Sequence, residues 1–312
     1  MAASSNIDCR GMKSLSTIIY RCLSLLARML PIGLAYLIGE TLSIVTFPLL
    51  RARKRNLESN LKVVLAHEGT PYARSETTRL ALAVAINFGR AVVDAFMAPY
   101  LNSKAIRIEV KGKEHLESAL RAGRGVILVT AHLGTWELGG AVLAAMGYRF
   151  TTVAGTQFTP WLSPHIKTLK QAIGIEVVAH TSALRIMRVL KAGGLVVLHI
   201  DGDQYLGGLK VNFFGRPATV PRGPAALALR AGAKLLCGFA VRKSRCEIAI
   251  EISREIPVVG SETEVTQRII DVVETNIRKH KNQWCMFRAC LLYTSDAADE
   301  GLGVDLGGRR II

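Results

Sequence analysis

The stretch VILVTAHLGTWELGG, residues 126–140, passes from an apolar run through a glycine-containing turn into a second apolar run. The run GVILVT, residues 125–130, is mostly apolar or β-branched, as in a buried strand. Gly134 permits a tight turn, and the pattern after it predicts a helix over 135–146. A strand, a turn and a helix in this order predict one unit of a parallel α/β sheet.

The same alternation extends over most of the chain. Further β-type runs occupy residues 106–110, 150–154, 175–179, 194–200 and 233–241. Helical stretches lie before or between them, at 74–98, 161–172, 182–192 and 223–232. We therefore expect an α/β fold in which a mixed, largely parallel sheet is flanked by helices and carries its ligands at the carboxyl ends of the strands.

The composition indicates an anionic and apolar partner. The 312 residues carry a formal net charge of +16, 50% of them are hydrophobic, and the mean hydropathy is +0.28. Such a charge favours nucleic acid, anionic lipid or a phosphorylated metabolite. Aromatic residues make up 6% and do not interleave with basic ones, so we expect a lipid and no nucleic acid. The six cysteines show no CxxC spacing, which indicates reduced thiols facing a cytosolic environment.

Residues 29–50 form an apolar run that is long enough to cross a bilayer and contains one charge, Glu40. Prolines and glycines interrupt the run, and Glu40 would be costly in hydrocarbon, so a helix lying in the interface or packed on the domain is the alternative to a spanning helix. The basic residues that follow at once are Arg51, Arg53, Lys54 and Arg55. We expect residues 1–55 to be a membrane-associated segment with a helix, at the cytoplasmic face of a membrane.

His132 and Glu137 are the first candidate catalytic residues. His132 follows the strand by two residues, and Glu137 lies five residues further on. On one continuous helix this offset would put the side chains about 140° apart. With His132 in a loop and Glu137 early in the next helix, the carboxylate can turn back and accept a hydrogen bond from one ring nitrogen. The other nitrogen would then be free to act as a general base.

A second polar group, LHIDGDQY, follows the strand at 194–200. His199, Asp201 and Asp203 would point to one side of an extended strand, which is compatible with a metal site. The alternative function is therefore a metal-dependent transferase or hydrolase acting on sugar nucleotides or phosphoesters. Acidic pairs at strand ends are also common as turn and capping residues.

Three further residues are candidates for substrate binding. Arg222 precedes a helix that begins near Pro224, where a guanidinium and backbone N–H groups can bind a phosphate or an oxyanion. An ordinary surface charge is the competing interpretation of Arg222. Phe213 and Phe214 either line an acyl channel or form a hydrophobic docking turn.

Four ordered blocks resemble a known family. They are AHLGTWE, LKAGGLVVLHIDGDQ, VNFFGRPATVPRGPAALALRAGAKLL and VVETNIRKHKNQW. In this order they are similar to the bacterial lipid A late acyltransferases, a pattern that the phosphatidylinositol mannoside acyltransferases share within the lysophospholipid acyltransferase superfamily. The chain departs from the pattern at Thr135, where the family usually has Asn, and in lacking a clear basic residue between the first two blocks.

The resemblance implies a glycerolipid acyltransferase-like fold and an O-acyltransferase that needs no metal or resident cofactor. The acyl chain would pass from an acyl carrier protein or coenzyme A thioester to a hydroxyl of a membrane glycolipid or lysolipid. His132 would be the general base, and Glu137 would orient and support it. Asp201 and Asp203 would position the acceptor or the catalytic loop. A non-enzymatic lipid-binding protein is a third class, but the His132/Glu137 pair is intact.

The family pattern predicts an acyltransferase domain over 56–289. Residues 290–312 lose the periodicity of the chain and change the sign of their charge. Our hypothesis is that this tail is foreign to the family and resembles translated sequencing-adapter sequence; finding it encoded at the native locus would contradict that. A genuine but disordered tail is the alternative.

Overall fold

A computed structural model describes residues 18, 22–26, 29–69, 74–98, 106–154, 163–179, 181–201, 207–288 and 290–291. Its helices are α2 (Ile32–Thr46), α3 (Arg51–His67), α4 (Arg74–Met97), α5 (Lys113–Arg121), α6 (Trp136–Ala145), α7 (Ser163–Ala172), α8 (Ala183–Lys191), α9 (Gly223–Ala231) and α10 (Glu262–Lys279), with the 3₁₀ turns η1 (Phe47–Leu49) and η3 (Lys281–Gln283). Its strands are β1 (Arg107–Lys111), β2 (Val126–Thr130), β3 (Phe150–Ala154), β4 (Glu176–Ala179), β5 (Leu195–His199), β6 (Leu209–Phe213), β7 (Arg216–Val220), β8 (Lys234–Ser244) and β9 (Glu247–Ile252).

The main sheet of the described chain has the order β1-β9-β8-β2-β5-β3-β4. Strands β8 and β9 form an antiparallel hairpin, and the other neighbours are parallel. Strands β6 and β7 form a separate antiparallel pair. The expected mixed, largely parallel sheet is therefore confirmed, and each expected strand and helix is present with ends that differ by at most a few residues. The sequence patterns did not predict α3, α5, α10, β9 or the β6–β7 pair.

Strand β2 lies in the middle of this sheet, between β8 and β5, and all five of its residues are buried. Its side chains alternate between the two faces, as the period of a strand requires. Ile127 and Val129 join the core that α8, α9 and α10 cover, whereas Val126 and Leu128 join the core that α5 and α6 cover. Both faces of β2 are thus fixed by packing, and the turn that follows it leaves the sheet at the carboxyl end of the strand.

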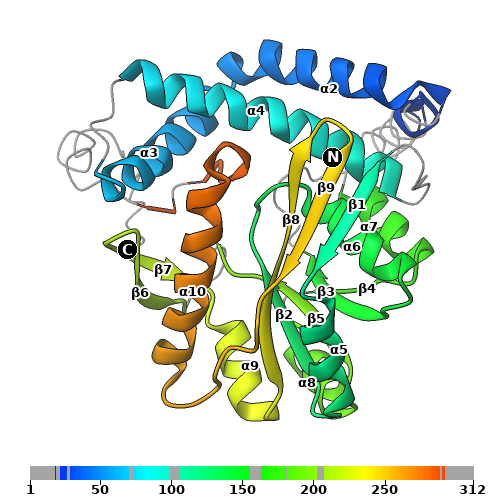
Figure 1. The fold of residues 1–312 in the computed structure, drawn as a ribbon, viewed down its shortest axis with the longest axis vertical. Coiled ribbons are helices and arrows are strands. Elements are labelled where there is room, and N and C mark those ends of the chain that lie inside the picture. Colours follow the sequence, from blue (N-terminus) through cyan, green and yellow to red (C-terminus); the bar gives the residue numbers. More distant parts are fainter. Residues whose placement is uncertain are drawn as a thin grey trace, which may run out of the picture.

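Helices α2 and α4 pack side by side across one end of the molecule (Figure 1). Their backbones approach closely at Gly39 and Gly89: a Cβ on Gly39 would lie 2.7 Å from the carbonyl oxygen of Gly89, and a Cβ on Gly89 would overlap Gly39. The opposite side of α2 and the turn after it expose apolar side chains. These are Leu34, Leu37, Ile38, Leu42, Ile44, Val45 and Leu49.

Glu40 does not face this exposed apolar side. It is 9% exposed, and its carboxylate pairs with Arg90 of α4 and Arg245 of the β8–β9 turn. By length and composition, two helices of the described chain could cross a membrane, Ile32–Leu49 and Arg74–Met97. The core helix of a soluble protein can have the same length and composition. The apolar stretch of Arg74–Met97 is 44% buried inside the structure, and that of Ile32–Leu49 is 22% buried. Helix α3 runs without a break across the expected segment boundary after residue 55.

Candidate active site

The loops that follow β2 and β5 carry the central pair of the site. The two strands are parallel neighbours, and Thr130 of β2 is in register with His199 of β5. His132 and Asp201 each lie two residues beyond these ends. Parallel strands end at the same edge of a sheet, where α/β proteins bind ligands. The fold therefore brings together two residues that are 69 positions apart.

Asp201 holds His132 through two contacts. Nδ1 of His132 lies 2.9 Å from Oδ1 of Asp201, and the backbone N–H of His132 donates to Oδ2, also at 2.9 Å. The indole Nε1–H of Trp284 donates to the same Oδ2 at 3.0 Å. An ionised carboxylate can only accept, so Nδ1 of His132 carries the proton. Nε2 is left with its lone pair, and the His132 side chain is 25% exposed.

The charges of the pair support each other. Burial disfavours the charged imidazole, but the charge of Asp201, the hydrogen bond to it and the charge of Glu137 raise the pKa of His132 above 6.5. Burial also opposes ionisation of Asp201, and the nearby His132 outweighs it and lowers the pKa of that carboxyl. The ring of His199 lies 4.6 Å from that of His132, centre to centre, and is tilted by 34° to it. Burial and the charge of His132 lower the pKa of His199 to about 3, so this ring stays neutral.

Glu137 has a different partner from the one expected. Its Oε2 lies 3.0 Å from Nζ of Lys170 on α7, whereas the Nδ1 contact of His132 goes to Asp201. Helix α6 begins at Trp136, whose ring lies edge-on to His132 at 5.2 Å between ring centres. The influence of Glu137 on His132 is through its charge. Asp201 was expected to position the acceptor or the catalytic loop, and its contact with the backbone N–H of His132 fits the second of these.

The loop from β2 to α6 is held from the far end of the chain. The N–H of Cys285 donates to the carbonyl of His132 at 2.8 Å, and the N–H of Gly134 donates to the carbonyl of Gln283 at 2.9 Å. Gly134 has φ +69°, and a Cβ there would overlap the carbonyl oxygen of Ala240. Only glycine fits this position. The segment around Trp284 therefore fixes both members of the pair.

An apolar pocket lies between the sheet and α6, directly beside His199. Its wall is formed by Leu128, Leu143, Phe150, Ile175, Val197, Phe239 and Ile250. The polar residues that line it are Thr130, Glu137, Thr152, Lys170 and His199, and Trp136, which lies next to His132, lines it as well. Three glycines, at 139, 140 and 238, keep side chains out of the pocket. The arrangement suits an apolar group whose polar end lies near His199, the ring that contacts His132.

Three residues expected to bind substrate lie elsewhere. Arg222 pairs with Glu262 at the first turn of α10, with Nη2–Oε2 at 2.6 Å. Helix α10 has 18 residues and is about 27 Å long. Trp284, which contacts Asp201, follows its other end, so Arg222 forms a surface ion pair that is remote from His132. Phe213 and Phe214 are 0% and 2% exposed and pack against Trp284, at 6.1 and 6.2 Å between ring centres. They support the indole that holds Asp201 and do not line the pocket.

The metal alternative rested on His199, Asp201 and Asp203. Asp203 lies outside the described residues. Both oxygens of Asp201 already accept N–H groups of His132 and Trp284. Within the described part of the chain, no group of three His, Cys, Asp or Glu side chains could hold a metal ion. The Nε2 atom of His199 is buried and has no hydrogen-bond partner.

An imidazole backed by a buried carboxylate, at the edge of a largely parallel sheet and near an apolar pocket, is an arrangement typical of general acid–base catalysis. The family model described as bacterial lipid A biosynthesis acyltransferase matches residues 7–292, and the chain belongs to this family of acyltransferases. The phosphatidylinositol mannoside acyltransferase of Mycobacterium tuberculosis is 29% identical over 216 residues, which is 65% of this chain and 67% of the relative. The enzyme of the same name from Mycolicibacterium smegmatis is 28% identical over 224 residues, 69% of this chain and 72% of the relative.

Proposed function

We propose that this enzyme transfers a fatty acyl chain from an acyl thioester to a hydroxyl of a glycolipid or lysolipid at a membrane surface. The observation that carries the proposal is the His132–Asp201 pair, whose imidazole contacts Trp136 and His199, two residues that line an apolar pocket, in a chain of the acyltransferase family. The names of the relatives, phosphatidylinositol mannoside acyltransferases, support a glycolipid acceptor. The donor would be an acyl carrier protein or coenzyme A thioester.

In the proposed reaction, His132 acts as the general base. Its Nε2 removes the proton of the acceptor hydroxyl while the hydroxyl oxygen attacks the thioester carbonyl carbon. The tetrahedral intermediate then collapses, the carbon–sulfur bond breaks, and the thiolate takes the proton from Nε2. The products are an ester and a free thiol, and His132 returns to its starting state. Asp201 keeps the proton on Nδ1 and stabilises the imidazolium that forms between the two steps.

Glu137 has a supporting role in this proposal. Its charge raises the pKa of His132 and so makes the imidazole a stronger base. Its ion pair with Lys170 places a cation among the residues that line the pocket. Lys170 can therefore interact with an anionic part of the donor or of the acceptor headgroup.

The pocket beneath α6 is the proposed binding site of the acyl chain. Gly140 faces its apolar wall: a Cβ there would meet Phe150 at 3.5 Å and Ile175 at 3.9 Å, which are ordinary contacts. Each buried CH₂ of a fatty chain contributes about 0.8 kcal/mol, so an apolar pocket of this kind provides much of the donor affinity. A side chain larger than methyl at residue 140 would compete with the substrate for the same space.

The exposed side of α2 is the proposed membrane contact. Its apolar side chains include Leu37, Leu42 and Val45, which are 49%, 57% and 62% exposed. The basic first turn of α3 follows directly, with Arg51 and Arg55 exposed. An apolar face bordered by basic residues suits a helix lying in the interface of an anionic membrane, at the cytoplasmic face of the inner membrane. Because Glu40 faces the protein, this interfacial orientation avoids placing a carboxylate in hydrocarbon.

The test uses the purified full chain with palmitoyl-coenzyme A and vesicles that contain phosphatidylinositol mannoside or a lipid A precursor. We expect release of free thiol together with one new acylated lipid, measured by mass spectrometry. His132→Ala should abolish both products, and His115→Ala, on α5, should leave them unchanged. Activity that a chelator abolishes and a divalent ion restores would instead support the metal-dependent alternative.

A further inference from the structure

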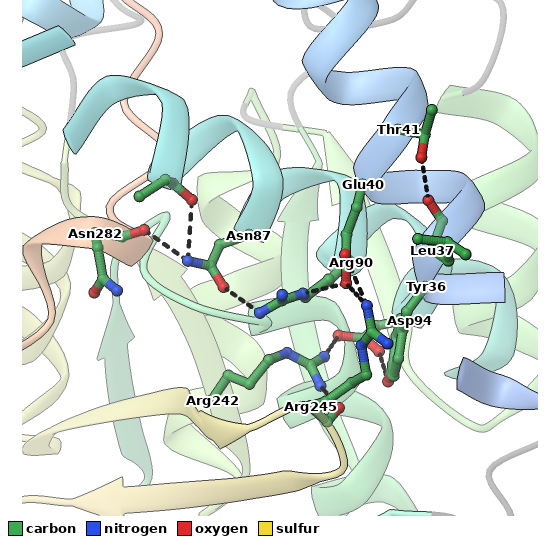
Figure 2. A network of polar contacts seen from close by, with 11 residues as sticks. Tyr36, Leu37, Glu40, Thr41, Asn87, Arg90, Asp94, Arg242, Arg245 and Asn282 are labelled. Atoms are coloured by element: carbon green, nitrogen blue, oxygen red, sulfur yellow. Dashed lines mark hydrogen bonds and ion pairs between the residues drawn. The ribbon is translucent and has the colours of Figure 1, made fainter. Parts of the chain in front are cut away.

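Asp94 is a fully buried carboxylate in α4 that the proposed reaction does not use. Three donors surround it. The hydroxyl of Tyr36 and the hydroxyl of Thr135 each donate to it at 2.6 Å, and the guanidinium of Arg242 forms an ion pair with it. Burying a charge is costly unless it is paired and hydrogen-bonded, as it is here. Figure 2 shows two of these donors, Tyr36 and Arg242, beside Asp94. The three donors come from α2, from the loop before α6 and from β8, so Asp94 joins three separate parts of the fold.

Thr135 connects Asp94 to the loop that carries His132. It occupies the position before the first residue of α6, where a threonine hydroxyl would normally cap the helix. Here the hydroxyl makes no such cap, and it donates to Asp94 instead. The backbone N–H of Thr135 donates to the carbonyl of Ala240 at 2.8 Å. Thr135 is therefore fixed on two sides, three residues after His132.

Arg242 connects Asp94 to the other member of the catalytic pair. The side chain of Gln283 accepts from the N–H of Arg242 at 2.8 Å and donates to its carbonyl at 2.9 Å. The next residue is Trp284, whose indole holds Asp201. The two routes from Asp94, through Thr135 and through Arg242, thus end at His132 and at Asp201.

Helix α2 reaches Asp94 through Tyr36. The guanidinium of Arg242 lies over the Tyr36 ring, 4.7 Å from its centre, and the Tyr36 hydroxyl binds Asp94. One turn later, Glu40 binds Arg245 at 2.8 Å and Arg90 at 2.8 Å (Figure 2). The polar side of α2 is thus bound into the interior, while its other side exposes the apolar residues described above.

We propose that Asp94 is a positioning residue of this acyltransferase: it sets the geometry of the His132–Asp201 pair through Thr135 and Arg242, and it makes that geometry depend on the seating of α2 through Tyr36. The inference rests on the proposed function for its kinetic test. A contact between α2 and the membrane would then change the geometry of the catalytic loop, because Tyr36 of α2 and Thr135 of that loop both donate to Asp94.

The kinetic test compares two substitutions at one position. Thr135→Val removes the hydroxyl that binds Asp94, and Thr135→Ser keeps it. We expect kcat to fall on the order of 100-fold in Thr135→Val, as a small misplacement of a catalytic group does, with little change in the KM for the thioester. Thr135→Ser should keep most of the activity. Tyr36→Phe should lower kcat in the same direction, whereas Thr275→Val and Tyr148→Phe, which remove hydroxyls elsewhere, should not.

A spectroscopic test needs no turnover. The Nδ1 proton of His132 faces a buried carboxylate and should give a downfield resonance in a histidine-labelled NMR sample. We expect Thr135→Val and Tyr36→Phe to shift or remove this resonance and the two controls to leave it in place. If the wild-type protein transfers no acyl chain but the resonance still shifts, the proposed function fails and the positioning role stands.

Three results would overturn the inference. One is a wild-type kcat and an unchanged resonance in both Thr135→Val and Tyr36→Phe. Another is a Thr135→Ser variant as defective as Thr135→Val, because the hydroxyl would then not be the important group. The third is a loss of kcat in the controls equal to that in the test variants. Each test substitution removes or keeps one hydroxyl, and circular dichroism verifies that the variants are folded.

Discussion

Asp201→Asn tests the identity of the carboxylate that acts with His132. The aspartate accepts three N–H groups, two on Oδ2 and one on Oδ1. Asparagine has the same shape but only one accepting oxygen. If that oxygen keeps the N–H groups of His132 and Trp284, the amide N–H₂ faces Nδ1 of the imidazole. Nδ1 must then accept, the ring proton moves to Nε2, and the atom that should take the substrate proton is blocked.

The size of the effect follows from this geometry. A hydrogen bond to a charged group contributes about 1.5–3 kcal/mol, and the corresponding change in a serine protease triad, which also reverses the tautomer, lowers kcat about 10⁴-fold. We expect a loss of roughly 10³–10⁴-fold in kcat for Asp201→Asn, with little change in KM. Asp271→Asn, at an exposed position on α10, is the matched control and should behave as wild type.

The pH dependence of the residual activity provides a second measurement. The base is active in its neutral form, so the rate falls as the pH drops through the pKa of His132, which lies above 6.5 in the wild-type protein. Asp201→Asn removes the charge and the hydrogen bond that raise this pKa and leaves the burial that lowers it. The acidic limb of kcat/KM should therefore move to lower pH.

The assay is thiol release from palmitoyl-coenzyme A in the presence of acceptor vesicles, measured across the pH range. A kcat for Asp201→Asn close to that of the wild type would refute the reasoning. A much larger loss in Glu137→Gln than in Asp201→Asn would show that Glu137 is the carboxylate that acts with His132, as the sequence pattern indicated.

Three further outcomes are expected. Glu137→Gln should move the acidic limb of kcat/KM to lower pH by less than Asp201→Asn does, because Glu137 acts on His132 through charge alone; an unchanged limb would contradict this. Gly140→Leu should shift preference toward shorter acyl donors, since the new side chain fills the pocket beside Phe150, and an unchanged chain-length profile would show that the acyl chain binds elsewhere. Leu42→Glu should weaken sedimentation with anionic vesicles while activity on a detergent-dispersed acceptor persists, and undiminished sedimentation would show that α2 is not the membrane contact.

The strand–turn–helix unit and the position of His132 could be predicted because they depend on local chemistry. The apolar residues of β2, the left-handed backbone at Gly134 and the helix after it are properties of neighbouring residues. The alternation of strands and helices along the chain likewise predicted a largely parallel sheet. The same local reasoning selected Glu137 as the partner of His132, because it is the nearest carboxylate in the sequence.

The actual contact depends on strand order, which no local pattern specifies. Since β5 lies beside β2, the carboxylate at Nδ1 is Asp201, and Trp284 joins it from another 83 residues away. The ion pair of Arg222 with Glu262 likewise depends on packing, which brings the start of α9 to the first turn of α10. In the sequence, Glu40 is a single charge in an apolar run and looked costly to bury. Packing brings Arg90 and Arg245 to it, and these residues neutralise its charge. Local composition thus defined the elements and the base, whereas the partner of that base follows from which distant strands and loops pack together.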